Sequence, residues 1–254
     1  MSAVLEVRGL AKHFTKDGQD LVALRGFDLA VEPGTFLVLL GRSGCGKSTL
    51  LNLLAGLTPA TSGQIRYQGQ ELTGPRTQIG YLTQHDTLMP WRDVRRNVEM
   101  PMELRGEPKK GRSDAAQALI ERVGLAGYER HYPRELSGGM RRRASLARML
   151  AGQPETLLLD EPFSALDAQL RAELQNDLLR LWSGSGRSVV FVTHDIDEAL
   201  ILADRVVVLG ALGRILLDQQ VDLARPRDLD DVRVDSRFVE LHRRLAAALK
   251  EGQS

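Results

Sequence analysis

A glycine-rich stretch that ends in a lysine and two hydroxyl residues is the part of the sequence best suited to chemistry. It runs Gly41-Arg42-Ser43-Gly44-Cys45-Gly46-Lys47-Ser48-Thr49 and fits the phosphate-binding loop pattern of glycine, four residues and then Gly-Lys-Ser. Glycines let the backbone turn so that successive N–H groups point inward, and a following helix presents its positive end to phosphates. Lys47 is predicted to contact the β- and γ-phosphates of a nucleotide, and the Ser48 hydroxyl can ligate Mg²⁺.

The flanking sequence favours this interpretation over the alternative of a plain glycine-rich turn. The apolar run Phe36–Leu40 before the loop is typical of a strand buried on both faces, and Ser48–Leu57 after it has helical character. Cys45 lies within the loop and could be taken for a nucleophile. We expect it to contribute only its backbone N–H, because in-line attack by water requires no thiolate.

A second apolar strand, Thr156–Leu159, ends in the carboxylates of Asp160 and Glu161. Ligands of open parallel sheets lie beyond the carboxyl ends of the strands. Asp160 is predicted to hold Mg²⁺, directly or through water, and Glu161 to orient and polarise the attacking water. The alternative is a strand that ends in a solvated acidic turn.

A third segment also predicts a phosphate-facing helix start. Ser137, Gly138 and Gly139 precede the helical run Met140–Leu150, so Ser137 can cap the helix while the glycines expose its N–H groups. An ordinary helix N-cap is the alternative.

Composition places the chain among globular proteins. It has 254 residues, of which 43% are apolar and 26% charged, and its formal net charge is +1. That charge gives no general argument for nucleic acid as a partner, and none is expected. Cys45 is the single cysteine, which excludes an internal disulfide. The sequence shows neither a signal peptide nor a run of about 20 apolar residues, so we expect any membrane role to come through a partner.

Strand and helix patterns alternate along most of the chain, which predicts an α/β fold with a largely parallel sheet. Strand-like runs are absent from a middle region, which we interpret as a helical subdomain with helices at Arg112–Val123 and Met140–Leu150. Further predicted strands are Leu5–Val7, Phe27–Val31, Gln78–Thr83, Ser188–Val192, Arg205–Leu209 and Arg214–Asp218. Further predicted helices are Ala168–Trp182 and Ile196–Ala203. A tail helix is predicted to bury Phe238, Leu241, Leu245 and Leu249 on one face.

The ordered motifs together resemble the ATPases of ABC transporters. Leu136-Ser-Gly-Gly-Met140 is similar to the family's signature sequence, and it lies between the phosphate loop and the Leu-Leu-Leu-Asp-Glu strand. Gln84 resembles the Q-loop glutamine, Ser164-Ala165-Leu166-Asp167 the D-loop, and His194 the switch histidine. Phe14 occupies the place of an aromatic residue that stacks on adenine; a core role is its alternative. The resemblance covers about residues 5–213.

The resemblance implies a fold and a division of the chain. The fold is an α/β P-loop NTPase with a RecA-like core, an inserted α-helical subdomain and an antiparallel β part near the N-terminus. An ATPase domain would span residues 1–225, with its core at about 1–85 and 153–225 and its helical subdomain at about 86–152. A C-terminal helical tail would follow at 226–254.

The resemblance also implies roles and partners. Glu161, His194 and Lys47 would be catalytic, and Ser48, Gln84 and Asp160 would hold Mg²⁺ beside ATP. The family forms head-to-tail dimers, in which Ser137–Gly139 of one subunit contacts the nucleotide on the loop of the other. Because the chain carries one set of motifs, we expect a second identical subunit. The resemblance further implies two membrane permease subunits and a periplasmic or extracellular solute-binding protein that acts through the permease.

Apolar residues close to Gln84 lie where the family receives its permease. They occur in Leu88–Trp91 and Met100–Met102, with Met89 and Trp91 as the expected contacts. A small local core is the alternative. The protein is then expected to be peripheral, on the cytoplasmic side of the inner membrane.

Further segments, among them Asn97–Gly106 and His194–Leu200, are most similar to those of the ATPases of taurine, aliphatic-sulfonate and nitrate importers. An importer ATPase for another cargo, a soluble non-transport ABC ATPase and a catalytically inactive binding module are the alternatives. The run Arg141-Arg142-Arg143 is predicted to be a solvated helix face rather than a nucleic-acid site. Arg142 departs from the glutamine that the family often has there, which leaves room for an acidic neighbour.

Overall fold

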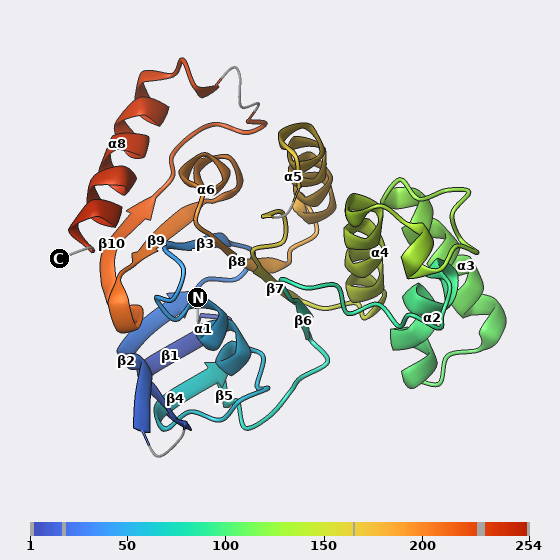
Figure 1. The fold of residues 1–254 in the computed structure, drawn as a ribbon, viewed down its shortest axis with the longest axis horizontal. Helices are drawn as coiled ribbons and strands as arrows, with labels where there is room; N and C mark the ends of the chain where they lie inside the picture. The colour runs from blue at the N-terminus through green and yellow to red at the C-terminus, as the bar shows by residue number, and fades with distance from the viewer. Residues whose placement is uncertain (1–2, 17–18, 165, 228–231, 253–254) are drawn as a thin grey trace. The chain divides into compact units, whose positions relative to one another are not determined.

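The computed structural model describes residues 3–16, 19–164, 166–227 and 232–252 (Figure 1). Ala165 of the predicted D-loop and part of the predicted tail, 228–231 and 253–254, lie outside the described residues. The chain divides into two compact units. Unit 1 consists of Met1–Arg76 and Gly186–Ser254, and unit 2 of Thr77–Ser185.

Unit 1 begins with an antiparallel sheet in the strand order β2-β1-β4-β5. Its strands are β1 (Leu5–Lys16), β2 (Gln19–Val31), β4 (Ser62–Tyr67) and β5 (Gln70–Glu71). Alternate residues of β1 point to the core, since Leu5 and Val7 are buried while Glu6 between them is partly exposed. The predicted antiparallel part near the N-terminus is therefore confirmed.

The second sheet of unit 1 is parallel except at its edge. Strands β3 (Phe36–Gly41), β8 (Ser188–Thr193) and β9 (Arg205–Leu209) run parallel, and β10 (Ile215–Gln220) pairs antiparallel with β9 after a 3₁₀ turn, η2 (Ala211–Gly213). Every residue of β3 and β8 is buried, which explains their continuous apolar sequences.

Among the described residues of unit 1, three helices cover this sheet. Helices α6 (Ile196–Leu202) and α8 (Ser236–Glu251) pack on β3, β9 and β10, and in Figure 1 α1 (Lys47–Leu54) and the antiparallel sheet lie on the other side. Helix α1 ends at Leu54, close to Gly56, which turns the chain with a φ of 70°. In α8 the buried face also uses Ala248, and Leu249 is partly buried. Phe238, Leu241 and Leu245 are buried as predicted.

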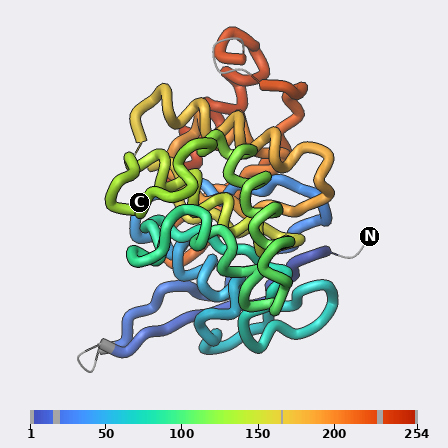
Figure 2. Tube along the Cα trace, turned by 90° about the vertical axis from the view of Figure 1, so that its right-hand side faces the viewer, coloured from blue at the N-terminus to red at the C-terminus, as the bar shows by residue number. Residues whose placement is uncertain are grey.

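Unit 2 joins two parallel strands to four helices. The strands are β6 (Ile79–Leu82) and β7 (Thr156–Asp160); the helices are α2 (Val94–Leu104), α3 (Lys109–Arg122), α4 (Gly138–Ala151) and α5 (Ala168–Trp182), with a 3₁₀ turn η1 (Pro133–Glu135) before α4. Figure 2 views the molecule from the side of α2, α3 and α4, which are coloured green to yellow-green. Side chains from these three helices share one apolar core, to which Val98, Ile120 and Ala147 belong.

Helix α2 was not predicted, because Pro101 in its sequence argues against a helix interior. The structure tolerates Pro101 in the third turn. Asp93 caps the helix by accepting a hydrogen bond from the Arg96 N–H at 2.8 Å. Val94, Val98 and Met102 follow a four-residue spacing and are buried, so core packing supports the helix despite the proline.

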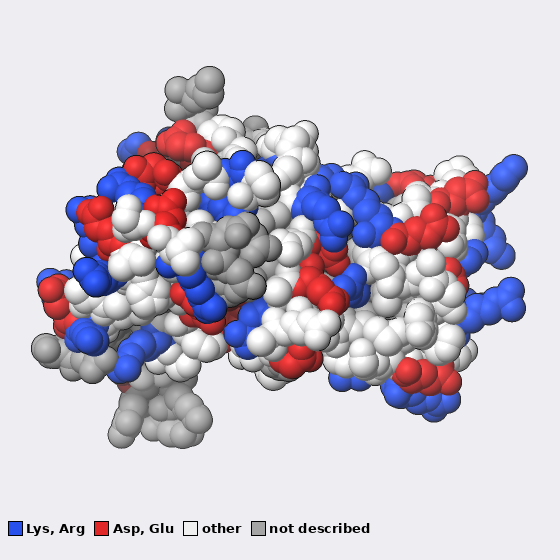
Figure 3. All heavy atoms as spheres, turned by 90° about the horizontal axis from the view of Figure 1, so that it is seen from above, with Lys and Arg blue, Asp and Glu red and all other residues white. Residues whose placement is uncertain are grey.

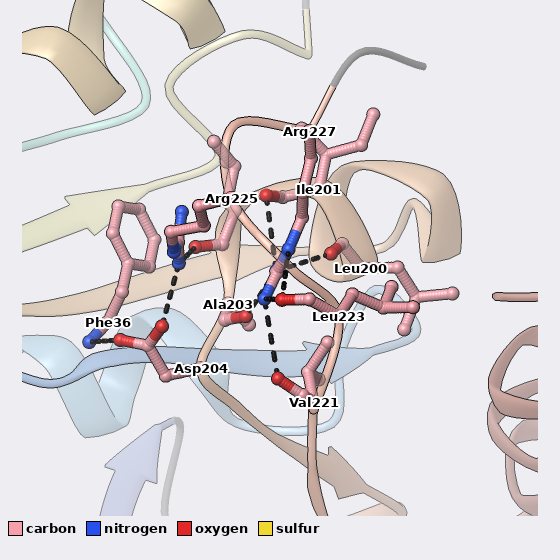
Figure 4. Close-up of polar contacts among 10 residues, drawn as sticks. Phe36, Leu200, Ile201, Ala203, Asp204, Val221, Leu223, Arg225 and Arg227 are labelled. Carbon is pink, nitrogen blue, oxygen red and sulfur yellow. Dashed lines mark hydrogen bonds and ion pairs between the residues drawn. The ribbon is translucent and has the colours of Figure 1, made fainter. Parts of the chain in front are cut away.

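An arginine clasp holds the segment after β10 against α6 (Figure 4). Arg227 is 5% exposed and donates hydrogen bonds to the carbonyls of Leu200, Ile201, Ala203, Val221 and Leu223, the shortest at 2.6 Å. The last carbonyls of a helix lack intrahelical partners and carry partial negative charge. The guanidinium therefore satisfies the end of α6 and joins it to the tail.

A neighbouring ion pair extends this clasp to β3. Arg225 donates to the Asp204 carboxylate at 2.8 Å and to the Leu202 carbonyl at 2.6 Å, and Asp204 accepts from the Phe36 N–H at 2.9 Å. The tail, α6 and the strand that leads into the glycine-rich loop are thereby linked.

Basic and acidic side chains are interspersed over the face drawn in Figure 3, in keeping with the formal net charge of +1. Within the described parts of the chain, none of the helices combines the length and the apolar character needed to cross a bilayer.

Candidate active site

The glycine-rich loop of unit 1 connects the end of β3 to α1. Gly46 caps α1 with a φ of 103°, and a Cβ at this position would lie 2.8 Å from the Ala23 carbonyl oxygen and from Leu24 Cδ2. Only glycine fits both this conformation and this close approach to β2. The loop is therefore pressed against the antiparallel sheet.

Lys47 folds back over the loop. Its side chain is buried, and Nζ donates hydrogen bonds to the carbonyls of Gly41 at 2.7 Å and Arg42 at 2.8 Å. Cys45 is also buried, with Sγ 4.0 Å from this ammonium group. The charge of Lys47 is thus held at the start of α1, where N–H groups without intrahelical partners favour an anion.

The remaining loop side chains face outward. Arg42, Ser43, Gly44 and Ser48 are exposed and Thr49 is partly exposed. These loop residues are therefore accessible from solvent.

His194 follows β8 at the same edge of the sheet. Strands β3 and β8 are parallel, with Leu40 opposite Thr193, so the glycine-rich loop and His194 leave the sheet side by side. The next residue, Asp195, is fixed on both sides: its N–H donates to Thr193 Oγ1 at 3.0 Å, and its side chain caps α6 by accepting from the Glu198 N–H at 3.1 Å. Unit 1 therefore brings His194 and the loop together.

Phe14 lies on the antiparallel sheet and is 39% exposed, which contradicts a purely core role. Lys12 Nζ lies 4.9 Å from the centre of its ring. Leu21 is its cross-strand neighbour and is also exposed. An apolar platform is thus available on unit 1.

Unit 2 brings Gln84, Asp160 and Glu161 to one edge of its strands. Leu82 pairs with Leu159 in parallel register, so the residues after β6 and β7 emerge together. Gln84 is exposed, and Asp160 is 5% exposed. The two halves of the predicted site therefore belong to different units.

Tyr81 accompanies Asp160. Its hydroxyl donates to Asp160 Oδ2 at 3.5 Å. The pKa of Tyr81 is raised above its usual range, first because burial disfavours the phenolate and then because the charge of Asp160 repels it. Sequence reasoning missed this neighbour.

Glu161 adopts a left-handed backbone conformation, with a φ of 40°. Such a conformation costs a non-glycine residue about 1–3 kcal/mol and is common at functional sites. The turn that follows is held locally, since the Glu161 carbonyl accepts from the Ser164 N–H at 3.3 Å and from Ser164 Oγ at 3.1 Å.

The predicted signature segment starts α4 as expected. Ser137 Oγ accepts from the Met140 N–H at 3.3 Å, and Gly138 and Gly139 form the first turn. A Cβ on Gly139 would lie 2.3 Å from Leu170 Cδ2, so a larger residue would push against α5. The helix tip thus combines a side-chain cap with small residues.

The three arginines that follow are not a solvated face, so that prediction was wrong. Arg141 pairs with Asp86 at 2.9 Å, and Arg143 pairs with Asp177 at 2.6 Å. Arg142 is 5% exposed and donates to the carbonyls of Thr83 and Pro162, both at 2.6 Å. Burial against the rest of unit 2 explains the difference, because polar partners on other segments satisfy each guanidinium.

A groove of about 340 Å³ opens beside β6. Its lining includes Met89, Met100 and Met149 together with Arg148. Trp91 is 70% exposed, whereas Leu88 and Met102 are buried in the core of the helices, so only part of the apolar segment forms a local core.

Comparisons with known proteins decide the family. A family model described as ABC transporter matches residues 24–164, more than half of the chain. The chain belongs to the ABC transporter family. An uncharacterised ABC transporter ATP-binding protein of Methanocaldococcus jannaschii is 46% identical over 252 residues, which is 99% of this chain and 93% of the relative.

Two further ABC relatives carry cargo names. The taurine import ATP-binding protein TauB of Escherichia coli K12 is 44% identical over 214 residues, 84% of each chain. The nitrate import ATP-binding protein NrtD of a Synechocystis strain is 44% identical over 207 residues, 82% of this chain and 78% of the relative.

The fold is also that of the ABC cassettes. A dimeric, post-hydrolysis structure of the ATP-binding cassette MJ0796 with ADP and Pi aligns with a TM-score of 0.79 and 27% identity, covering 87% of this chain and all of that one. The predicted P-loop NTPase fold is therefore confirmed. The residue roles and the predicted domain boundaries remain predictions.

Proposed function

We propose that this ABC protein is the ATP-binding subunit of an importer, which couples Mg-ATP binding and hydrolysis to membrane transport of a small anionic solute such as taurine, a sulfonate or nitrate. The observation that carries the proposal is the buried ammonium group of Lys47, held by loop carbonyls at the start of α1. A nucleotide's phosphates can replace those carbonyls as its partners.

In this proposal, unit 1 binds the nucleotide. The residues 41–49 hold its phosphates through backbone N–H groups and through Lys47. Phe14 offers its half-exposed ring to the adenine. His194, at the same sheet edge as the loop, donates a hydrogen bond to the γ-phosphate from a ring N–H.

Unit 2 supplies the acidic groups. The site residues fit Mg²⁺, since this ion prefers oxygen ligands and in phosphate sites uses one or two carboxylates. Asp160, buried beside Tyr81, and the exposed Gln84 would hold the ion together with Ser48 of unit 1. Mg²⁺ would neutralise charge on the phosphates. Glu161 orients the attacking water and accepts its proton.

A second identical subunit completes each site in the proposal. Ser137, Gly138 and Gly139 begin a 14-residue helix whose N–H groups suit a phosphate, and the chain carries one set of motifs. Nucleotide bound on the loop of one copy would contact this helix tip in the other. ATP would favour the closed dimer because it touches both copies only there.

The permease contact is proposed for the groove beside β6. Its methionines can adapt to different partners, and Trp91, two residues after Met89 in the chain, is a large exposed anchor. Two permease subunits would each use one copy, and a periplasmic or extracellular solute-binding protein would act through them. The protein would then be peripheral on the cytoplasmic side of the inner membrane. An importer with a different cargo is the second candidate.

Transport in proteoliposomes tests the proposal. The permease is reconstituted with this protein and Mg-ATP inside, the solute-binding protein is added outside, and uptake of labelled taurine, an alkanesulfonate and nitrate is measured. We expect ATP-dependent uptake of one of these anions, lost in Lys47→Ala. Uptake of a different solute alone would support the second candidate, an importer with another cargo. Uptake that does not depend on ATP would contradict the proposed role of this protein as the ATP-binding subunit.

A further inference from the structure

We propose that Arg142 is a positioning residue for hydrolysis, which ties the signature helix α4 both to the turn that carries Glu161 and to the segment that carries Gln84. The inference rests on the proposed function. All three segments belong to unit 2.

Arg142 contacts both segments directly. Its Nε donates to the Pro162 carbonyl at 2.6 Å, and Pro162 follows Glu161 in the chain. Its Nη1 donates to the Thr83 carbonyl at 2.6 Å, and Thr83 precedes Gln84. A planar guanidinium holds these two donors at a fixed angle, so the two carbonyls are held at a fixed separation.

Two other arginines of α4, Arg141 and Arg148, contact only one of these segments. Arg141 pairs with Asp86, and Arg148 donates to the Thr87 carbonyl at 2.6 Å and to the Thr87 hydroxyl. Both therefore reach the residues after Gln84. Among the described residues, Arg142 is the arginine of α4 with a hydrogen bond to the turn after Glu161.

The backbone of Glu161 needs such support. A left-handed φ of 40° persists in a non-glycine residue only when its surroundings enforce it. The Pro162 carbonyl belongs to the next residue, so a hydrogen bond to it restricts rotation of the turn. Without Arg142 the turn can relax and the Glu161 carboxylate can move. A displacement of about 1 Å at a reacting group can cost about 100-fold in rate.

Arg142 is buried at a cost that packing alone does not explain. Among the described residues, its Nη2 is buried and has no hydrogen-bond partner. Burial lowers the pKa of Arg142 to about 10, and the charges of Asp86 and Asp160 oppose that shift, so the group stays protonated at neutral pH. A methionine would fill the same space without this cost, which favours a role for the two hydrogen bonds.

Three variants separate the two bonds from the bulk of the side chain. Arg142→Met keeps an unbranched apolar stem and removes both bonds. Arg142→Gln places an amide nitrogen where Nε lies, so it retains the bond to Pro162 and loses the bond to Thr83. Arg143→Met is the matched control, because Arg143 is the next residue of α4 and bonds to Val123 and Asp177 instead.

Steady-state ATP hydrolysis and ATP binding are measured for each variant well below its Tm. We expect Arg142→Met to lower kcat about 10-fold or more while KM for ATP stays within about twofold, the pattern of a lost transition-state contribution. Arg142→Gln should recover most of the rate, and Arg143→Met should stay within about twofold of the parent. A kcat for Arg142→Met equal to that of Arg143→Met would overturn the inference.

A double-mutant cycle tests the route of the effect. If Arg142 acts through Glu161, Arg142→Met should not slow single-turnover hydrolysis further in a Glu161→Gln background. Multiplicative losses would contradict that route. Failure of the inference and of the proposed function are distinguishable, since the parent must hydrolyse ATP and lose that activity in Lys47→Ala whatever Arg142 does.

Discussion

Among the described residues, three buried cationic side chains have main-chain carbonyls as hydrogen-bond partners. Lys47, Arg142 and Arg227 are each 5% exposed, and each donates hydrogen bonds to main-chain carbonyls. Carbonyl oxygens carry enough negative charge to stabilise a cation, while an unpaired buried charge would be costly. For Lys47 this arrangement holds the ammonium group over the loop, where the proposed function has phosphate oxygens replace the carbonyls.

Tyr81 gives a residue-scale prediction on pH. Because its pKa is raised above the ordinary 10.0, the phenol stays protonated in the folded protein through pH 10–11. The stability that the neutral phenol contributes is fully present below pH 10 and is lost as pH rises toward the raised folded pKa. Absorbance at 295 nm, parent minus Tyr81→Phe, should show no step near pH 10. A step there would mean that Tyr81 ionises normally.

At the scale of elements, the sheet strands follow from local sequence. Runs such as Phe36–Leu40 and Ser188–Val192 are continuously apolar because both faces are covered, and the structure places strands there. Helix α2 does not follow from local sequence, because its support is a core shared with α3 and α4 that overrides Pro101.

Some residues of the candidate site can likewise be predicted from local sequence, and others cannot. Loop and strand-end residues such as Lys47 and Asp160 are visible in the sequence because chemistry demands their types and spacing. Arg142 gave only a weak signal, its departure from the family's usual glutamine. Its two carbonyl partners lie 59 and 20 residues away along the chain, so only the fold reveals them.

The arginine clasp gives an element-scale prediction. Arg227→Met leaves the last carbonyls of α6 without these hydrogen bonds, so we expect a loss of about 3 kcal/mol of unfolding free energy. For a chain of this size that corresponds to a Tm lower by about 6–12 °C. Thermal melts by circular dichroism measure it.

Arg237→Met is the control for the clasp, since Arg237 is an exposed arginine of α8 that pairs with Asp222. Exposed ion pairs contribute about 0–1 kcal/mol, so its Tm should change little. Equal Tm values for the two variants would show that the clasp does not stabilise the fold.

At the scale of the whole molecule, each unit carries part of the proposed site. Unit 1 holds Lys47 and His194, and unit 2 holds Asp160, Glu161 and the signature helix tip. The proposed mechanism needs both units of one copy and the helix tip of another. Its central claim is that two copies enclose ATP between the glycine-rich loop and the partner's Ser137–Gly139.

Light scattering of the Glu161→Gln variant with Mg-ATP tests that claim most directly, because slow hydrolysis preserves the bound state. Ser137→Asp in this background keeps a good helix cap but adds negative charge, and Ser137→Asn is its neutral capping control. We predict dimers with ATP for Glu161→Gln alone and with Ser137→Asn, and monomers with unchanged ATP affinity for Ser137→Asp. Monomers at saturating ATP in every variant, or dimers that tolerate Ser137→Asp, would contradict the account.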